Sequence, residues 1–492
     1  MNIRDEIVEQ RKKRLWAQGH AQGLCLPSAR ELPLRPFGPE GEHPFVICEI
    51  KRRSPSKGAI NEELDPVILA GRYIEGGAGF LSVLTEEAYF HGSLADLMAV
   101  KKARPEAAVL RKDFLLDEED IDVSFRAGAD AVLLIAAALE ARSLRAMHER
   151  AASLGMAALV ELHSPEDVEK VRDFKPPLTG VNSRSLETFT IDLLRPPLVR
   201  GLVDWPSRTV FESGVSGRAG ACLAGSLGFD GILAGEALVR DPGAAAVLIQ
   251  GFRDGRAAPF PFWNEIARRL GQRLASGRQT PLVKICGLTN TDDVLAADSL
   301  GADILGFVFA QSPRRTDSAF VSSLPETRAL KAAVIVPSET NEKLFYEVAE
   351  LVQRGKLDVI QMHGPADGPF YSRQALPSYG VIQPGSAQET ADLVRNYAAA
   401  GSSPRFLLDA CLPGAAGGTG KRLSAEILDA AKTSGPLWIA GGIRPENVRD
   451  IIKRWKPELI DLCGGVEASP GKKDIAKMKA LFESVRSEDA GS

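Results

Sequence analysis

Short apolar runs alternate along the chain with longer segments in which apolar residues recur every three or four positions. Runs rich in Val, Ile, Leu and Phe are typical of buried strands, and the longer periodic segments, such as 64–77 and 140–155, are typical of helices that end at a glycine. We predict that the first half contains eight strands, at residues 45–51, 80–85, 108–114, 131–136, 157–162, 178–184, 209–214 and 231–235.

The same alternation begins again after residue 281, with shorter helical segments such as 290–302 between the runs. Eight further strands are predicted, at residues 282–287, 304–309, 332–337, 359–364, 379–384, 405–410, 437–442 and 459–465.

Eight strands with helical crossovers in each half favour an α/β fold of two consecutive (β/α)8 TIM barrels. Doubly wound sheets also alternate strands and helices, but the phosphate-binding pattern GxGxxG is absent after the first strand of either half. We predict a first barrel at 1–258, a helical linker at 259–280 and a second barrel at 281–492. Residues 1–43 form a helical extension, expected to cover the first barrel's floor or to lie over its mouth.

Length and composition narrow the possible functions. A chain of 492 residues is too long for a single hydrophobic core, which suggests at least two domains. A net charge of −4 gives no electrostatic reason to expect binding of nucleic acid. The basic run 11–14 is interpreted as a solvated helix face. The six cysteines form no CxxC pair, which fits a reducing compartment. No secretory signal or apolar span is evident, so we expect a soluble, cytoplasmic monomer without membrane partners, metal or cofactor.

Polar residues close the predicted strands of the first half. In CEIKRRSPSKG, which starts at Cys48, Glu49 and Lys51 are two apart and therefore point to the same face of a strand. An exposed edge strand would also explain one such pair. Five of the eight strands end this way, however, and strand ends converge at one mouth of a barrel, where lysines and glutamates shift each other's pKa. The candidate residues are Glu49, Lys51, Lys112, Glu161, Asn182, Arg184 and Glu212.

The segments CEIKRRSPSKG, LTEEAYFHGS, LRKDF, VELHS, GVNSRSLETF, FESGVS and LAGEAL resemble indole-3-glycerol-phosphate synthase along residues 1–258. The resemblance implies closure of an indole ring on 1-(2-carboxyphenylamino)-1-deoxyribulose 5-phosphate, with loss of CO2 and water. It implies that Lys112 is the principal general acid, that Glu161 is the base of the dehydration, and that Lys51 steers the substrate carboxylate or shares the acid work. Glu49, Asn182 and Glu212 would hold the charged network.

The same resemblance implies a substrate-binding set of Ser54, Phe90, Phe114, Arg184, Ser213, Gly214 and Gly235. The two phenylalanines are expected either to hold the anthranilate ring or to belong to the core. The phosphate is expected on Ser54 and on backbone amides near the two glycines. Two positions depart from the family pattern: Glu236 replaces a small hydroxyl residue, and Ser185 replaces an aspartate.

In the second half, Cys286 ends the first predicted strand and Asp409 ends the sixth. A lone cysteine is often buried filler, but a thiolate and a carboxylic acid on opposite sides of a sugar suit proton transfer from carbon to oxygen. His363 ends another strand, where a structural histidine is an equal alternative. A glycine loop, GGTG at 417–420, follows the aspartate.

The segments KICGLTN, GFVFAQSPR, QMHG, LLDA, GGTGK, AGGI, DLCGGVE and PGKKD resemble phosphoribosylanthranilate isomerase along residues 282–475. The resemblance implies an Amadori rearrangement in which Cys286 removes the C2′ proton and Asp409 protonates the ring oxygen. Arg314 would pair with the anthranilate carboxylate, with Arg315 as the alternative. The remaining substrate-binding candidates are His363, Gly441, Gly442, Gly464 and Gly465, and Cys463 stands where a small hydroxyl residue is commoner.

The two resemblances fit together because the product of the isomerase is the substrate of the synthase. Both substrates are phosphorylated anthranilate sugars. A phosphosugar aldolase or epimerase is one rival, but an aldolase needs a single Schiff-base lysine, whereas the first half offers two lysines among three glutamates. A non-catalytic barrel is another rival, and the intact acid and base pairs in both halves argue against it.

Overall fold

The computed structural model describes the two halves of the chain as separate compact units, Met1–Pro259 and Phe260–Ser492. The described residues are 3–38, 44–54, 58–278, 280–338, 340–364, 376–400, 403–410, 422–433 and 435–487.

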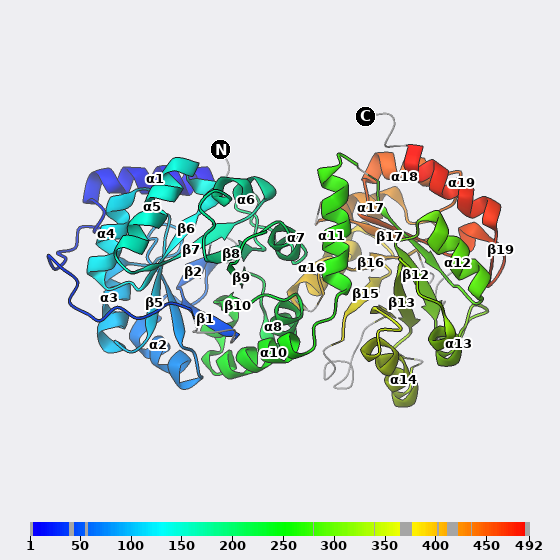
Figure 1. Ribbon diagram of the computed structural model, residues 1–492, viewed down its shortest axis with the longest axis horizontal. Coiled ribbons are helices and arrows are strands. Elements are labelled where there is room, and N and C mark those ends of the chain that lie inside the picture. The colour runs from blue at the N-terminus through cyan, green and yellow to red at the C-terminus, as the bar shows by residue number, and fades with distance from the viewer. Residues whose placement is uncertain are drawn as a thin grey trace. The chain divides into compact units, whose positions relative to one another are not determined.

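The first unit is built on a closed barrel of eight parallel strands (Figure 1). Each strand pairs with its neighbours in sequence, and the last strand, β10, closes the barrel on the first, β1. Nearly every strand residue is buried, as expected where side chains fill the barrel on one face and pack under helices on the other. The strands are β1 (Phe45–Ile50), β4 (Phe80–Leu84), β5 (Ala108–Lys112), β6 (Ala131–Ile135), β7 (Ala157–Leu162), β8 (Leu178–Asn182), β9 (Arg208–Glu212) and β10 (Gly231–Ala234).

Helices connect these strands and cover the outside of the barrel. Several begin at a side-chain cap: Asp65, Ser93 and Asp117 each accept hydrogen bonds from backbone amides of the first turn. The helices are α2 (Pro66–Glu75), α3 (Leu94–Ala103), α4 (Glu118–Ala127), α5 (Ala141–Ser153), α6 (Pro165–Val171), α7 (Arg195–Arg200), α8 (Gly217–Ser226), α9 (Glu236–Arg240) and α10 (Ala245–Ala257). Short elements are the hairpin β2 (Arg53–Ser54) and β3 (Gly58–Ala59) and the 3₁₀ turns Ala136–Ala138 and Pro242–Ala244.

The N-terminal segment reaches both ends of the first barrel. Helix α1 (Ile3–Gln18) lies at the mouth, where Ile7 is buried in the core cluster with Phe114. The chain then runs along the barrel to its floor, where the Phe37 ring lies 5.3 Å from that of Phe80 at the start of β4. Arg30 fastens this run by donating to the Asp130 carboxylate at 2.8 Å. Each of the two predicted locations is therefore occupied, the mouth by a helix and the floor by an irregular segment.

The interpretation of the basic run 11–14 as a solvated face is wrong for Arg11. Its side chain is 4% exposed, and Nη2 donates to Oδ1 of Asp120 at 2.6 Å. Arg14 also turns toward the barrel and pairs with Glu86 at 3.2 Å. Arg11 and Arg14 therefore anchor α1 to the mouth, whereas Lys12 and Lys13 are exposed to solvent, as predicted.

The second unit is a second closed barrel of eight parallel strands, joined in sequence order with β18 closing on β11. Its strands are β11 (Leu282–Cys286), β12 (Ile304–Val308), β13 (Leu330–Ile335), β14 (Val359–His363), β15 (Ser378–Ile382), β16 (Leu407–Leu408), β17 (Trp438–Ala440) and β18 (Leu459–Leu462). Its helices are α11 (Phe262–Ala275), α12 (Thr291–Leu300), α13 (Ser318–Ser323), α14 (Glu342–Gln353), α16 (Ala387–Ala400), α17 (Ala425–Lys432), α18 (Val448–Trp455) and α19 (Ile475–Arg486). A 3₁₀ turn, Gly464–Val466, precedes the hairpin β19 (Glu467–Ser469) and β20 (Lys472–Lys473).

Helix α11 falls in the segment that the sequence sets apart as a linker, and it packs onto the second barrel. The ring of Trp263 lies 5.7 Å from that of Trp438, at the start of β17, and Phe262 stacks on Tyr379 at 6.2 Å. Arg273 pairs with Asp303, just before β12, at 2.7 Å. These contacts place α11 at the end where the strands begin.

The prediction of two consecutive (β/α)8 barrels is confirmed, and all sixteen predicted strands are present with small shifts of their ends. Among the described residues, no helix is both long and apolar enough to cross a membrane.

Candidate active sites

Lys112 is the centre of the first mouth. It ends β5, and its Nζ lies 3.2 Å from Oε2 of Glu161 on β7 and 3.3 Å from Oε2 of Glu212 at the end of β9. Burial opposes its charge, but the two carboxylates, together with Glu49, outweigh burial and raise the pKa of Lys112. The lysine is therefore held as an ammonium group among acids.

Glu161 and Glu212 form a buried pair that divides its protons unequally. Burial and the neighbouring Glu161 raise the pKa of Glu212 well above its usual range. Burial also works against the charge of Glu161, but Lys112 and His163 outweigh it and lower the pKa of Glu161 to about 2. One carboxyl of the pair is thus ionised and the other carries a proton, as interacting carboxyls do when they share a site.

Glu49 and Lys51 form the second charged contact of this mouth. Lys51 Nζ donates to Oε1 of Glu49 at 2.6 Å, and Glu49 is only 3% exposed. Glycine on the neighbouring strand end makes room for the pair, because a Cβ on Gly235 would lie 2.4 Å from Glu49 Oε1. Likewise, a Cβ on Gly180 would lie 1.8 Å from Glu212 Oε1. The carboxylates of Glu49 and Glu212 therefore occupy space that a side chain at Gly235 or Gly180 would fill.

Asn182, Arg184 and Ser213 lie where β8 and β9 leave the barrel. Asn182 Oδ1 accepts a hydrogen bond from the backbone amide of Arg184 at 3.0 Å. Burial lowers the pKa of Arg184, and the negative charges of Glu236 and Glu49 act in the opposite direction. The guanidinium of Arg184 therefore lies close enough to the Glu49–Lys51 pair to interact with its charge. Ser213 and Gly214 both have positive φ, 66° and 76°, so the chain turns sharply after β9.

The aromatic candidates of the first mouth differ in burial. Phe114 is 7% exposed and belongs to the core cluster, while Phe90 is half-buried and packs against that cluster. Ser54 is buried, and its hydroxyl has no hydrogen-bond partner within the described part of the chain. Residues 55–57 of the serine-rich loop lie outside the described residues.

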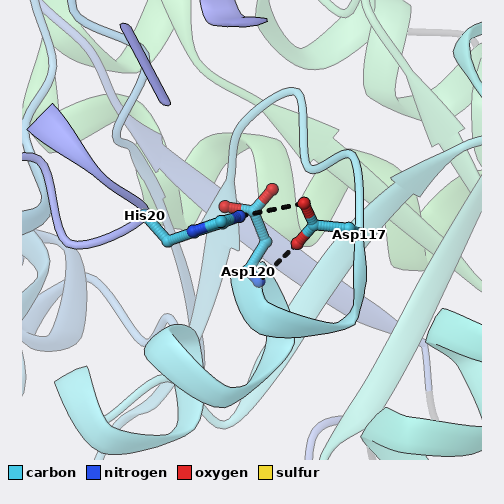
Figure 2. A group of neighbouring side chains, drawn as sticks. All are labelled: His20, Asp117 and Asp120. Atoms are coloured by element: carbon cyan, nitrogen blue, oxygen red, sulfur yellow. Dashed lines mark hydrogen bonds and ion pairs between the residues drawn. The ribbon is translucent and has the colours of Figure 1, made fainter. Parts of the chain in front are cut away.

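Three side chains of the kinds that can bind a metal ion lie close together beside this mouth: His20, Asp117 and Asp120 (Figure 2). His20 Nε2 lies 2.9 Å from Asp117 Oδ2, and Asp117 Oδ1 caps α4 by accepting from the Asp120 amide at 3.1 Å. Both oxygens of Asp120 already accept hydrogen bonds, from Arg11 at 2.6 Å and from the Leu116 amide at 2.8 Å. The group therefore serves to fasten the chain after α1 to the first turn of α4.

The second mouth contains a cavity of about 390 Å³ that gathers the candidates of the second half. Cys286 enters it from β11 and Asp409 from the turn after β16, on a distant strand of the same barrel. Its lining includes every site residue predicted for this half, namely Cys286, Arg314, His363, Asp409, Gly441, Gly442, Gly464 and Gly465. The GGTG loop lies outside the described residues.

Below Cys286, a buried ion pair spans two neighbouring strands. Lys284 Nζ lies 2.6 Å from Asp461 Oδ2, with the lysine fully buried. A hydrogen bond from the Cys463 thiol, aided by the charge of Lys284, outweighs burial and lowers the pKa of Cys286 to about 7. The thiol is thus poised to act as a base near neutral pH.

Asp409 is shifted in the opposite direction. Burial and the negative charge of Asp461 raise the pKa of Asp409 to about 6. Its carboxyl therefore keeps a proton over a wider pH range than an exposed aspartate does, which suits a proton donor. The cavity thus brings together a thiol that loses its proton easily and a carboxyl that holds one.

Arg314 lines the cavity and is held in place by a carboxylate. Its Nε and Nη2 donate to the two oxygens of Glu467 at 2.9 and 2.8 Å. Lys473 Nζ also reaches Glu467 Oε1, at 3.1 Å. Arg315 is exposed and does not line the cavity.

His363 and two glycine turns complete the lining. Gln361 Nε2 lies 2.8 Å from His363 Nε2 and donates to it, and burial, reinforced by Lys284, lowers the pKa of His363 to about 4. The imidazole is therefore neutral at pH 7. Gly441 and Gly442 both have positive φ after β17, and a Cβ on Gly465 would lie 1.9 Å from the carbonyl oxygen of Ile443. Backbone of the two turns therefore lies in close contact beside the cavity.

Comparison with known proteins bears on both mouths. The indole-3-glycerol phosphate synthase model matches residues 3–249, and the N-(5′-phosphoribosyl)anthranilate isomerase model matches residues 283–484. An indole-3-glycerol phosphate synthase from Streptomyces coelicolor is 41% identical over 254 residues, covering 50% of this chain and 93% of that relative.

The chain belongs to both families.

The multifunctional tryptophan biosynthesis protein of Schizosaccharomyces pombe is similar to both halves of this chain, with 31% identity over 90% of the chain. The chain spans 59% to 63% of the length of the multifunctional relatives it matches. A solved phosphoribosyl anthranilate isomerase from Thermus thermophilus is 30% identical, covers 42% of this chain and 98% of that structure, and has a TM-score of 0.34.

Sequence reasoning missed the buried charges that tune the isomerase-family mouth. Lys284 and Asp461 each interrupt an apolar strand, in LVKIC and LIDLC, and this interruption is the available signal for an inward-facing ion pair. Glu467 was also missed, although GVE follows directly after the glycine turn. In the synthase-family mouth, the VELHS segment contains His163, which was not predicted as a site residue. Its Nε2 lies 3.2 Å from Glu161 Oε1.

Proposed function

We propose that this chain catalyses two consecutive steps of tryptophan biosynthesis. The second barrel isomerises N-(5-phosphoribosyl)anthranilate to 1-(2-carboxyphenylamino)-1-deoxyribulose 5-phosphate, and the first barrel closes the indole ring to give indole-3-glycerol phosphate. The proposal rests on one observation: each barrel has its own candidate acid and base at its mouth. Monomeric state and cytoplasmic location stay predictions from the sequence.

In the isomerase barrel, Asp409 protonates the furanose ring oxygen, and the C1′–O bond opens to an iminium ion. The thiolate of Cys286 then removes the C2′ proton, giving an enolamine that tautomerises to the aminoketose. The directions of both pKa shifts support these roles, because the acid gains affinity for its proton and the base loses it. Placement on distant strands lets the two groups act on different atoms of one sugar.

The isomerase substrate carries a carboxylate and a phosphate. Arg314 is the proposed partner of the anthranilate carboxylate, because Glu467 holds its guanidinium in place beside the cavity. Backbone amides of the glycine turns at 441–442 and 464–465 would hold the phosphate, as successive amides do in other anion sites. His363, neutral and fixed by Gln361, would position a sugar hydroxyl.

In the synthase barrel, Lys112 protonates the substrate carbonyl oxygen as the aromatic ring attacks its carbon. Loss of CO2 restores the aromatic ring. In the dehydration Glu161 removes a proton from the ring being formed, and the hydroxyl group leaves as water with a proton from one of the two lysines. The ionised state of Glu161 suits a base, and the ammonium state of Lys112 suits an acid. Lys51, held by Glu49, steers the substrate carboxylate or shares the acid work.

The remaining candidates of the first barrel would hold the substrate. Asn182 and Arg184 would contact the hydroxyls of the intermediate, and half-buried Phe90 is better placed to meet the anthranilate ring than Phe114, which belongs to the core cluster. The phosphate would lie on backbone near the first barrel's last two strands, together with the unpartnered hydroxyl of Ser54. The proposed phosphate site comprises Ser54, Ser213, Gly214 and Gly235.

The test supplies phosphoribosylanthranilate to the purified protein and measures indoleglycerol phosphate. Cys286→Ala is expected to abolish the first step alone, and Lys112→Ala the second alone, each by about 100-fold or more. Each variant serves as the other's folding control, because the untouched half-reaction is assayed in the same protein.

A variant that leaves both steps intact would remove its residue from the proposed site. Borohydride trapping addresses the aldolase alternative, because a covalent lysine adduct with substrate is expected only if a Schiff base forms.

A further inference from the structure

Two cysteines meet at the mouth of the second barrel. Cys286 ends β11 and Cys463 follows the last residue of β18, and these strands are direct neighbours. The register pairs Lys284 with Asp461, so two residues further along Cys286 stands beside Cys463. Side chains two apart share a face, and the Lys284–Asp461 ion pair therefore shows that both thiols are directed to the same side.

Their spacing suits a disulfide. Neighbouring strands lie about 4.8 Å apart, and disulfides join residues whose Cα atoms are about 4.4–6.8 Å apart. The Cys463 thiol also lowers the pKa of Cys286, as a close neighbour does. A Cβ on Gly287 would lie 2.9 Å from Cys463 Sγ, so that sulfur lies against the chain directly after Cys286. Bond formation thus requires little movement of either strand.

Both sulfurs are reachable by a small molecule. Cys286 and Cys463 line the cavity of about 390 Å³, so a reagent of substrate size or smaller can enter beside them. Lys284, buried under the thiols, and Lys473, whose Nζ contacts the backbone carbonyl oxygen of Cys463 at 3.2 Å, favour a thiolate at this position. Thiolate, access and a neighbouring thiol are the three requirements of thiol–disulfide exchange.

We infer that Cys286 and Cys463 form a modification site that reacts with small aliphatic disulfides and closes to a reversible intramolecular disulfide. The Cys286 thiolate attacks one sulfur of the reagent, whose S–S bond breaks and releases one thiolate. The released thiolate takes the proton of Cys463, whose sulfur then attacks the sulfur of Cys286 and expels the second half of the reagent as a thiolate. That thiolate takes up from water the proton that Cys286 released on ionising. Two protein thiols are oxidised by two electrons, and one disulfide is reduced to two thiols.

The other described cysteines lack this arrangement. Cys48 and Cys222 are buried, and burial raises the pKa of both, that of Cys48 to about 12. Cys25 is exposed and stands by itself, while Cys411 lies outside the described residues. Among the described cysteines, closure to an intramolecular disulfide is therefore expected at the Cys286–Cys463 pair, whereas Cys25 can form only an adduct with the reagent.

Oxidation at this site removes the proposed base of the isomerase, because a sulfur in a disulfide cannot accept the C2′ proton. This consequence rests on the proposed function, whereas the disulfide itself does not. The first barrel, which uses lysines and glutamates, keeps its chemistry in the oxidised protein.

The test treats full-length protein with bis(2-hydroxyethyl) disulfide in a Cys25→Ser/Cys411→Ser background, with Cys463→Ser added as the matched variant. We expect a mass lower by two hydrogen atoms and a peptide cross-link between the segments holding Cys286 and Cys463. Isomerase rate should fall by about 100-fold or more, synthase rate should not change, and dithiothreitol should restore the isomerase. The matched variant should instead retain a mercaptoethanol adduct on Cys286.

A stable reagent adduct on Cys286 in the parent, or no reaction at either thiol, would overturn the inference. A cross-link in a protein whose reduced form has no isomerase activity would support the disulfide and contradict the proposed function. The cross-link is read by mass, so the two failures are distinguishable.

Discussion

The two mouths place an acid and a base at the ends of barrel strands, but they distribute charge differently. In the first mouth the reactive groups touch: Lys112 lies within 3.3 Å of both Glu161 and Glu212. In the second mouth the strong ion pair, Lys284 with Asp461, lies beneath the reactive groups. Cys286 and Asp409 thus come under the influence of charges that do not themselves occupy the reacting positions.

This difference shows two routes to a poised site. In the first mouth, close charges and burial move pKa values far from neutrality: against burial, Lys112 and His163 keep Glu161 ionised, while burial and the charge of Glu161 keep Glu212 protonated. In the second mouth the shifts are smaller: the Cys463 thiol and the charge of Lys284 lower the pKa of Cys286 to about 7, and burial with the charge of Asp461 raises the pKa of Asp409 to about 6. The activity of the first barrel should therefore change little with pH near neutrality, whereas the activity of the second barrel should change more.

The largest effect is expected from Glu161→Gln, which removes an ionised carboxylate while keeping its shape. Synthase rate should fall by about 100- to 10,000-fold, the range for loss of a general base. The matched substitution Glu212→Gln should cost less, because Glu212 already carries a proton and the amide replaces a neutral group. Steady-state synthase kinetics of both variants check this, with the isomerase rate as the folding control.

Equal losses in the two glutamine variants would contradict the unequal division of protons between these carboxyls.

Lys284→Met probes the buried pair of the second barrel. Removing the lysine leaves Asp461 charged, buried and unpaired, which costs about 3–5 kcal/mol of stability. Calorimetry should show the second barrel's unfolding transition moving to lower temperature while that of the first does not change. The double variant Lys284→Met/Asp461→Leu should recover much of the lost stability, because neither charge of the pair is then present. Absence of recovery would indicate that the lysine stabilises the barrel by some means other than this pairing.

A smaller effect is expected from Gly180→Ala in the first barrel. The new Cβ would lie 1.8 Å from Glu212 Oε1, so the carboxyl must move away from Lys112. Displacement of this size should reduce synthase rate by about 10- to 100-fold. Gly79→Ala is the control, since a Cβ there meets nothing within 4 Å. If both alanine variants keep full synthase activity, the position of Glu212 is not critical.

The pH dependence of the isomerase should give the mildest effect. The active form needs Cys286 without its proton and Asp409 with one, so activity falls in acid as the thiolate is protonated and in alkali as the carboxyl ionises. A bell-shaped kcat/KM profile with limbs near pH 6 and 7 is expected. Synthase activity, measured on the same samples, should change less over this interval.

Much of this architecture could be predicted from patterns in the sequence. Strand positions followed from apolar runs, and the gathering of Lys112, Glu161 and Glu212 followed from the rule that strand ends of a barrel converge. The same rule brought Cys286 and Asp409 into one cavity.

Other features depend on contacts between residues far apart in sequence. Arg11 lies in a run that is polar on every side, and its burial depends on Asp120, 109 residues away. The contact of Arg314 with Glu467 spans 153 residues. Local periodicity carries no information on such pairs. Which carboxyl of a pair holds the proton likewise depends on distances that only the fold sets.

Helix α11 determines where the gene can be divided to express the isomerase barrel separately. A fragment starting at the first strand residue, Leu282, would lose Phe262 and Trp263 and leave the ring of Trp438 uncovered. Each large aromatic buries roughly 150–250 Å², so such a fragment would expose an adhesive apolar surface and tend to precipitate. A cut between Pro259 and Phe260 keeps the helix with the barrel it covers, and is the division at which soluble halves are expected.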